Sequence, residues 1–262
     1  SVKKYGISFI GAGKVAGVLS RAFSDLGHRI ISIVSRREEN CHELVESLNS
    51  TWSSDPFFSD STDIIVIAVP DDTIREVSNK LRCPEKTIVA HTAGSIGIDV
   101  FPSELKHTGV LYPLQTFSTG RKITFRNLPF FIEASDRNSE TVLVELVDSL
   151  EAKAHFAEAS SRRLLHIAAV FACNFTNHML AASKIIAMEA GEEFSTLEPL
   201  VRETILKAFE NGPVKSQTGP AVRSDIGTIE KHIELLSFSP ELQQIYKQVT
   251  SSIMDLYKKK SI

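Results

Sequence analysis

A glycine-rich loop near the start of the chain has residue types and spacing suited to binding a dinucleotide. Residues 11–16, GAGKVA, fit the pattern G-x-G-x-x-G/A. In this pattern the first glycine allows a tight turn, the second lets the backbone approach a diphosphate, and a small last residue lets a helix pack closely on a sheet. The helix N-terminus then offers unpaired N–H groups to phosphates. A plain strand–helix turn is the alternative. The predicted cofactor-binding residues here are Gly11, Ala12, Gly13, Lys14 and Val15.

The residues after the second expected strand indicate which dinucleotide is preferred. An NAD site usually places Asp or Glu about 20 residues beyond the glycines, where it holds the ribose 2′-OH. This chain has Ser35-Arg36-Arg37 at that point and no acid. A serine hydroxyl and two guanidinium groups suit a 2′-phosphate. We therefore predict NADP rather than NAD, the alternative being two solvated arginines at a helix start.

Two later strands are expected to end beside the same ligand, because open α/β sheets bind ligands beyond the carboxyl ends of their strands. The first is followed by Val69-Pro70, whose backbone we expect to border the cofactor, and by Asp71-Asp72, which we expect to cap the next helix. The second ends at His91. This histidine either contacts the cofactor or is a structural histidine satisfied within the protein.

Further polar residues are candidates for contact with a substrate. Ser95 belongs to a small polar segment after His91, and Gln115 belongs to the segment 112–117, which we expect to form another wall of the cleft. Arg223 lies in the irregular segment 217–225. It either pairs with a substrate carboxylate or belongs to a plain loop whose Ser224 or Asp225 caps the following helix.

A polar strip in the apolar segment 165–178 is the candidate for catalysis. His166 and Asn174 lie two helical turns apart and share a face of the expected helix. A histidine titrates near neutrality, so His166 could donate a proton to a carbonyl or imine, with Asn174 orienting the substrate. The alternative is that these groups pair with one another or across a subunit contact. Because the segment is mostly apolar, we expect the helix to be buried. The histidines lack the spacing of a zinc site, and we predict no metal.

The order of elements predicts two domains. Short, nearly continuous apolar runs indicate strands covered on both faces, and they alternate with helical segments. This alternation predicts a doubly wound, mostly parallel sheet, a Rossmann domain, over residues 1–159. Residues 160–262 predict only helices, at about 161–190, 195–210, 226–236 and 240–258. The predicted strands are 7–10, 30–34, 64–69, 87–90, 110–112, 129–133 and 154–157, and the predicted helices between them are 14–26, 38–48, 73–81 and 139–150.

Composition limits the possible partners and location. The net charge of -3 over 262 residues argues against nucleic acid or an anionic membrane as the main partner. The longest uninterrupted apolar run, 167–173, is far short of the roughly 20 residues of a membrane span. The N-terminus enters a strand pattern at once and leaves no room for a signal peptide. Three scattered cysteines suit a reducing compartment. We therefore expect a cytoplasmic protein.

Six motifs in order resemble those of one protein family. They are GAGKVA, AVPDD, HTAGS, YPLQTF, HIAAVFACNF and TGPAVRSD. The chain resembles Rossmann-like proteins whose C-terminal half is called domain of unknown function 2520, described as NADP-dependent oxidoreductases. Their layout is similar to that of pyrroline-5-carboxylate reductase and the β-hydroxyacid dehydrogenases.

The resemblance implies a helical domain of the 6-phosphogluconate dehydrogenase C-terminal type, a homodimer through that domain, and a small-molecule substrate between the domains. β-Hydroxyacid dehydrogenases use a lysine, with an asparagine one turn later, on the corresponding helix. Here His166 and, two turns on, Asn174 stand on that helix, and the stretch that holds them has no lysine. The expected reaction is NADPH-dependent reduction of a carbonyl or imine. A non-catalytic NADP(H) sensor or interaction protein is the alternative.

Overall fold

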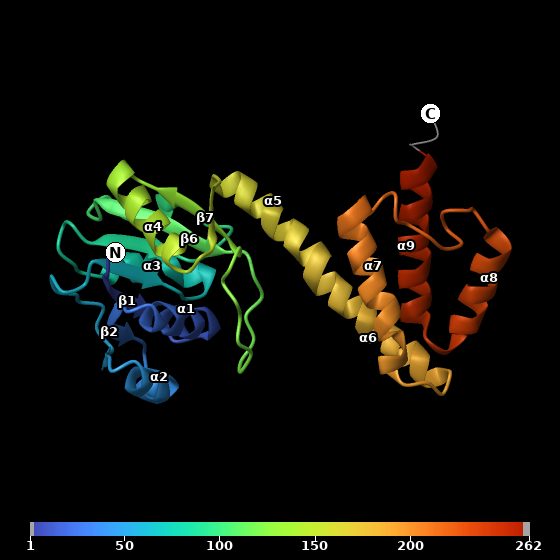
Figure 1. The fold of residues 1–262 in the computed structure, drawn as a ribbon, viewed down its shortest axis with the longest axis horizontal. Helices are drawn as coiled ribbons and strands as arrows, with labels where there is room; N and C mark the ends of the chain where they lie inside the picture. The colour runs from blue at the N-terminus through green and yellow to red at the C-terminus, as the bar shows by residue number, and fades with distance from the viewer. Residues whose placement is uncertain (1–2, 259–262) are drawn as a thin grey trace. The chain divides into compact units, whose positions relative to one another are not determined.

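The chain divides after Ala172 into two compact units. The computed structural model describes residues 3–258. The division falls within the long helical segment that begins at Ala159, so the first turns of this segment belong to the N-terminal unit. Figure 1 shows the sheet-containing unit in blue to yellow and the helical unit in orange to red.

An eight-stranded, mostly parallel sheet forms the N-terminal unit. The strand order is β3-β2-β1-β4-β5-β6-β7-β8, and the antiparallel pair is β6 with β7. The predicted Rossmann fold is thereby confirmed. The sequence pattern missed the three-residue edge strand β3. The strands are β1 Gly6–Ile10, β2 Arg29–Val34, β3 Thr51–Ser53, β4 Ile64–Ile67, β5 Ile88–His91, β6 His107–Pro113, β7 Pro129–Ala134 and β8 Lys153–Phe156.

Helices cover both faces of the sheet because side chains alternate along each strand. In β4, Ile64 and Val66 pack in the core beneath α1, α2 and α4, whereas Ile65 and Ile67 pack in the core beneath α3. The N-terminus of α4 is capped by Asp136, whose carboxylate accepts the Ser139 N–H at 2.8 Å. These helices are α1 Lys14–Asp25, α2 His42–Ser47, α3 Ile74–Lys80 and α4 Arg137–Ser149, with short 3₁₀ turns at Glu38–Asn40, Asp71–Thr73 and Ile98–Val100.

The C-terminal part of the chain is helical, as predicted. Asp225 caps α8 by accepting the Thr228 N–H, one of the two caps that the sequence proposed. The helices are α5 Ala159–Ala169, α6 Thr176–Glu189, α7 Glu198–Asn211, α8 Ile226–Leu235 and α9 Pro240–Lys258. A π-helical segment, Val170–Phe175, joins α5 to α6, and 3₁₀ turns occupy Phe194–Leu197 and Leu236–Phe238.

The expectation that the helix carrying His166 is buried was wrong. Large apolar side chains on it are exposed, among them Leu164, Ile167 and Met188. An apolar helix is buried only if something covers it, and the sequence alone does not say whether the cover lies in the same chain. By length and composition Ala159–Glu189 also passes as a membrane span. One such helix is weak evidence, because core helices of soluble proteins and signal sequences pass the same test.

Candidate functional site

The glycine loop begins one wall of a groove at the carboxyl ends of β1, β4 and β5. Gly11 has φ +108°, and a Cβ there would lie 2.2 Å from the carbonyl oxygen of Ala68, so this position requires glycine. Gly13 differs, because a Cβ there would meet no atom within 4 Å. The open space above Gly13 lets a ligand approach the backbone closely. The loop therefore fits a diphosphate cradle at the N-terminus of α1.

The groove itself has a volume of about 390 Å³. It lies between the glycine loop and the segments that follow β4 and β5, in the crevice where the strand order reverses between β1 and β4. Seven of the residues predicted to bind the cofactor line it. The lining residues are Gly11, Ala12, Gly13, Lys14, Val15, Ala68, Val69, Pro70, Asp71, Thr92 and Ala93.

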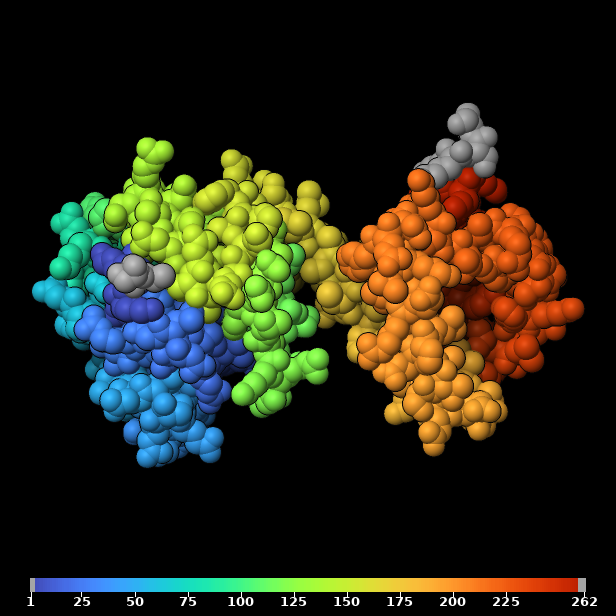
Figure 2. Space-filling view, in the orientation of Figure 1, coloured from blue at the N-terminus to red at the C-terminus, as the bar shows by residue number. Residues whose placement is uncertain are grey.

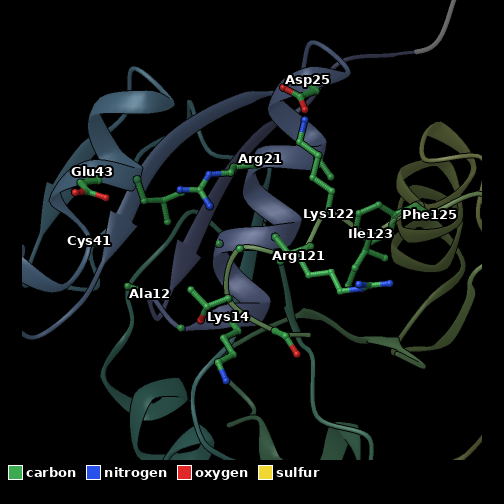
Figure 3. A pocket seen from close by; sticks show the side chains of 18 of the residues that line it. Ala12, Lys14, Arg21, Asp25, Cys41, Glu43, Arg121, Lys122, Ile123 and Phe125 are labelled. Carbon is green, nitrogen blue, oxygen red and sulfur yellow. The ribbon is translucent and has the colours of Figure 1, made fainter. Parts of the chain in front are cut away.

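A larger cavity, about 1120 Å³, shares Ala12, Gly13 and Lys14 with this groove. It runs along the flank of α1 toward α2 and the loop 118–126, away from the strand ends. Figure 3 shows Arg21 extending from α1 toward the side on which Glu43 lies, and Lys122 beside Asp25. Because ligands of open α/β sheets bind beyond the strands, the smaller groove is the candidate ligand site.

The predicted 2′-phosphate residues follow β2 but do not line the groove. Arg36 and Arg37 are exposed. The Ser35 hydroxyl is engaged within the protein, since it donates to the Arg37 carbonyl and accepts the Trp52 indole N–H, both at 3.0 Å. Glu76 of α3 has a lowered pKa, caused first by Lys80 and to a smaller extent by Arg36. Arg36 therefore lies close enough to α3 for its charge to act on that helix.

His91 is a structural histidine rather than a cofactor contact. Its side chain is fully buried, its Nε2 lies 3.1 Å from the Gly97 carbonyl, and its Nδ1 accepts the Ala93 N–H at 3.1 Å. Both ring nitrogens are used in ordering the loop 92–97. The assignment of His91 to cofactor binding is corrected accordingly, because both nitrogens of the buried ring have partners within the protein.

We expect the buried His91 to make stability depend on pH. Burial lowers its pKa from 6.5 to about 4. The unfolded chain binds a proton here below about pH 6.5 while the folded chain stays neutral, so stability falls as the pH is lowered. Between pH 7.5 and 5 the loss is about 2 kcal/mol by linkage. Urea titrations of the wild type and His91→Asn should differ in this dependence of stability on pH. Equal slopes for wild type and His91→Asn would contradict this prediction.

Asp71 does not cap the helix that follows β4, contrary to expectation. Neither Pro70 nor Thr73, the residues that precede the 3₁₀ turn and α3, makes a side-chain cap. The Asp71 carboxylate instead accepts the Ser95 hydroxyl at 3.0 Å. A 3₁₀ turn intervenes before α3 and moves the acids away from its first turn. The bond joins two walls of the groove, because Asp71 follows β4 and Ser95 follows β5.

His166 is close to this site within the same compact unit. Its Nδ1 lies 3.2 Å from the hydroxyl of Tyr112, near the end of β6. Arg162, one helical turn earlier, is fully buried. Its guanidinium donates to the carbonyls of Gly94, Ile96 and Ala157 and to the Glu133 carboxylate. Residues 94–96 directly follow groove residues 92 and 93, so this network holds the start of α5 against one wall of the groove.

The remaining candidate residues belong to two different compact units. Gln115 is exposed and accepts the N–H of its neighbour Thr116 through its side-chain oxygen. Asn174 and Arg223 are exposed residues of the C-terminal unit. Sequence reasoning missed Arg162 altogether and gave Tyr112 no role beyond the cleft wall. Tyr112 lies near the carboxyl end of a strand that runs parallel to its neighbour β5, and this position could have singled it out from the sequence.

A glycine-loop groove at the switch point of a doubly wound sheet is the arrangement of a Rossmann-type dinucleotide-binding protein. The family described as "NADP oxidoreductase coenzyme F420-dependent" matches residues 6–94, and "Domain of unknown function (DUF2520)" matches residues 128–253. A Bacteroides fragilis structure described as "putative NADP oxidoreductase" is 34% identical, with 97% of this chain and 100% of that chain covered and a TM-score of 0.85. The chain belongs to this family of Rossmann-like oxidoreductases with a DUF2520 domain.

More distant structures share the fold. A reductive aminase from Aspergillus terreus, solved with NADPH and ethyl-5-oxohexanoate, is 12% identical with a TM-score of 0.69, covering 95% of this chain and 93% of that one. A pyrroline-5-carboxylate reductase from Coxiella burnetii is 17% identical with a TM-score of 0.60, covering 98% of both chains. No curated protein sequence matches. The comparisons favour an oxidoreductase over a non-catalytic sensor.

Proposed function

We propose that this protein is an NADP-dependent reductase of a carbonyl or imine in a small polar molecule. Bound in the groove, NADPH supplies a hydride to the substrate carbon. The observation that carries the proposal is the contact between His166 and Tyr112. Through this contact Tyr112 holds the His166 ring beside the loop 92–97, at the strand end where the substrate is expected. A histidine can supply the proton that the reduction needs.

The other substrate contacts remain proposals. Ser95, on the loop that Arg162 holds, is proposed to contact the substrate, and Gln115 and Arg223 are further proposed contacts. Asn174 is proposed to orient the substrate. The guanidinium of Arg163 donates through Nε to the Ser95 carbonyl at 3.0 Å. Its outer N–H groups could then pair with an anionic group of the substrate.

A substrate screen tests the proposed function. NADPH oxidation is followed with panels of keto acids, cyclic imines, and ketones mixed with amines. At least one compound should be reduced, and His166→Gln should lose most of the turnover while keeping its NADPH affinity. Turnover that is unchanged in His166→Gln would overturn the role of His166. Tight NADPH binding with no reduction across all panels would overturn the proposed reaction.

We propose NADP as the preferred cofactor, with Arg36 and Arg37 binding the 2′-phosphate. The double variant Arg36→Ala/Arg37→Ala should raise the Kd of NADPH about tenfold or more, since two charge-assisted hydrogen bonds are lost. The Kd of NADH should change little. Arg29→Ala removes a charge at the other end of the same strand and is the matched control. Equal affinity of the wild type for NADPH and NADH would refute the preference.

We also propose that the protein is cytoplasmic, since a reducing compartment suits its three free cysteines. We further propose that it forms a homodimer through the helical domain. Among described residues 173–258, the buried apolar side chains are Ala221, Ile229, Leu236 and Leu242. So small a core leaves large side chains such as Leu206 and Phe209 exposed, and a second copy could cover them.

Light scattering should give about twice the chain mass of 28.9 kDa. Leu206→Glu/Phe209→Glu should shift the mass toward the monomer, whereas Glu210→Lys on the same helix should not. A monomeric wild type would contradict the proposed dimer.

A further inference from the structure

The ring of Tyr112 is held firmly by the loop beside the groove. A Cβ built on Gly94 would lie 2.7 to 3.0 Å from three ring atoms of Tyr112, so the glycine backbone lies directly against the aromatic face. The Gly94 carbonyl in turn accepts a hydrogen bond from buried Arg162 at 3.1 Å. The loop and the Tyr112 ring thus support each other, and the ring has little freedom to move.

His166 is held in the same assembly from the other side. It follows Arg162 by one helical turn, and Arg162 and Arg163 both donate to carbonyls of the loop 94–96. The Tyr112 hydroxyl contacts Nδ1 of His166. Nε2 of this ring has no hydrogen-bond partner among the described residues 3–258. Nδ1 therefore faces the protein and Nε2 is left for a ligand.

We propose that Tyr112 is a positioning residue for proton transfer: its hydroxyl accepts the Nδ1–H of His166 and so keeps Nε2 as the atom that gives the proton to the substrate. The inference rests on the proposed function, which it deepens by assigning one ring nitrogen to each partner. In a neutral histidine, the hydrogen bond that one ring nitrogen makes sets which nitrogen carries the proton.

The proton balance follows from this arrangement. In the charged ring both nitrogens carry hydrogen, with Nδ1–H donating to Tyr112 and Nε2–H donating to the substrate oxygen or nitrogen. As the substrate carbon accepts the hydride, the π electrons of the C=O or C=N bond take the Nε2 proton. The Nε2–H bonding pair stays on the ring, which becomes neutral and keeps its Nδ1–H. The substrate is reduced, the nicotinamide is oxidised, and Tyr112 gains and loses nothing.

Tyr112 is less suited to be the proton donor itself. Burial, and to a smaller extent the charge of Asp71, raise the pKa of its hydroxyl above the ordinary value of 10. A tyrosinate at this position is therefore disfavoured, whereas the hydroxyl is well able to accept a hydrogen bond. This electrostatic setting supports an accepting and orienting role.

The first test reads the ring of His166 directly, without turnover. In ¹⁵N-histidine-labelled protein, long-range ¹H–¹⁵N spectra distinguish Nδ1–H from Nε2–H in the neutral ring, with His166→Gln assigning the signal. Wild-type His166 should be mainly Nδ1–H, and Tyr112→Phe should shift it toward the Nε2–H form that free imidazole ordinarily favours. The same tautomer in both proteins, or mainly Nε2–H in the wild type, would overturn the inference.

The second test uses any substrate that the screen identifies. Tyr112→Phe keeps the ring that packs on Gly94, so it should lower kcat about tenfold or more with little change in NADPH affinity. In the His166→Gln background it should have no further effect, because the two residues act as a unit. Additive losses would overturn the inference.

A matched control is Tyr246→Phe, which removes another tyrosine hydroxyl paired with a histidine, His232, at 2.8 Å. It should leave both the His166 spectrum and kcat unchanged. If the tautomer shift occurs and no substrate is reduced, the assignment of the ring nitrogens stands and the proposed function fails. The two can therefore fail separately.

Discussion

Replacing Arg162 by Met is expected to lower the free energy of unfolding by about 3 kcal/mol, the low end of the range for breaking a buried ion pair. The guanidinium is fully buried and has four hydrogen-bond partners, so its removal leaves three carbonyls and the Glu133 carboxylate without a donor. The low end applies because the Glu133 side chain is 23% exposed and water can reach it. Urea denaturation monitored by circular dichroism measures the loss.

Arg163→Met is the matched control for this prediction. The two arginines are adjacent on α5, but Arg163 is exposed and makes one hydrogen bond, to the Ser95 carbonyl. Its replacement should cost less than about 1 kcal/mol. Similar losses for the two variants would show that Arg162 is not the residue that holds α5 against the sheet.

Arg162 also has a functional consequence. His166 lies one turn further along α5, and its ring reaches Tyr112 only while the start of the helix stays in place. We therefore expect Arg162→Met to weaken the His166–Tyr112 contact in addition to lowering stability. The tautomer signal of His166, measured under conditions where the variant is folded, should move in the same direction as in Tyr112→Phe.

The sequence predicted the sheet well because its signal is local. Buried parallel strands are nearly continuous apolar runs, and residues 64–67 show this plainly, since all four are buried. The edge strand Thr51–Ser53 was missed because it lacks this signal. It has one neighbouring strand and partly exposed side chains, so its sequence contains no continuous apolar run. The glycine loop was also predictable, since its chemistry depends on consecutive residues.

The site was less predictable because it is assembled from distant segments. Arg162 contacts residues more than sixty positions away, and nothing in its neighbours along the chain marks it as buried. Arginine is almost never fully buried unless paired, so an exposed helix residue was the natural expectation. The sequence left His91 open between a structural role and a cofactor contact, because a histidine at the end of a strand has the same sequence pattern in both cases. Burial and partners decide between them, and both come from the fold.

Gly11→Ala and Gly13→Ala are both expected to weaken NADPH binding, but only Gly11→Ala is expected to lower stability. At Gly11 a methyl group would lie 2.2 Å from the Ala68 carbonyl oxygen, at a φ of +108° that an alanine rarely adopts. The loop and the end of β4 would have to separate, with a loss of about 3 kcal/mol or more in unfolding free energy. NADPH binding should be lost as well, because the turn that forms the cradle is distorted.

At Gly13 the backbone has φ −79°, and a methyl group would meet no atom within 4 Å. Gly13→Ala should therefore keep its melting temperature within a few degrees of the wild type. Its methyl group would occupy the space through which the diphosphate approaches the backbone, so we expect the Kd of NADPH to rise at least tenfold. Calorimetric melting and NADPH fluorescence titration measure the two effects. A Gly13→Ala variant with unchanged NADPH affinity would show that the diphosphate does not bind above Gly13, and the cofactor would then have to be sought in the cavity along α1.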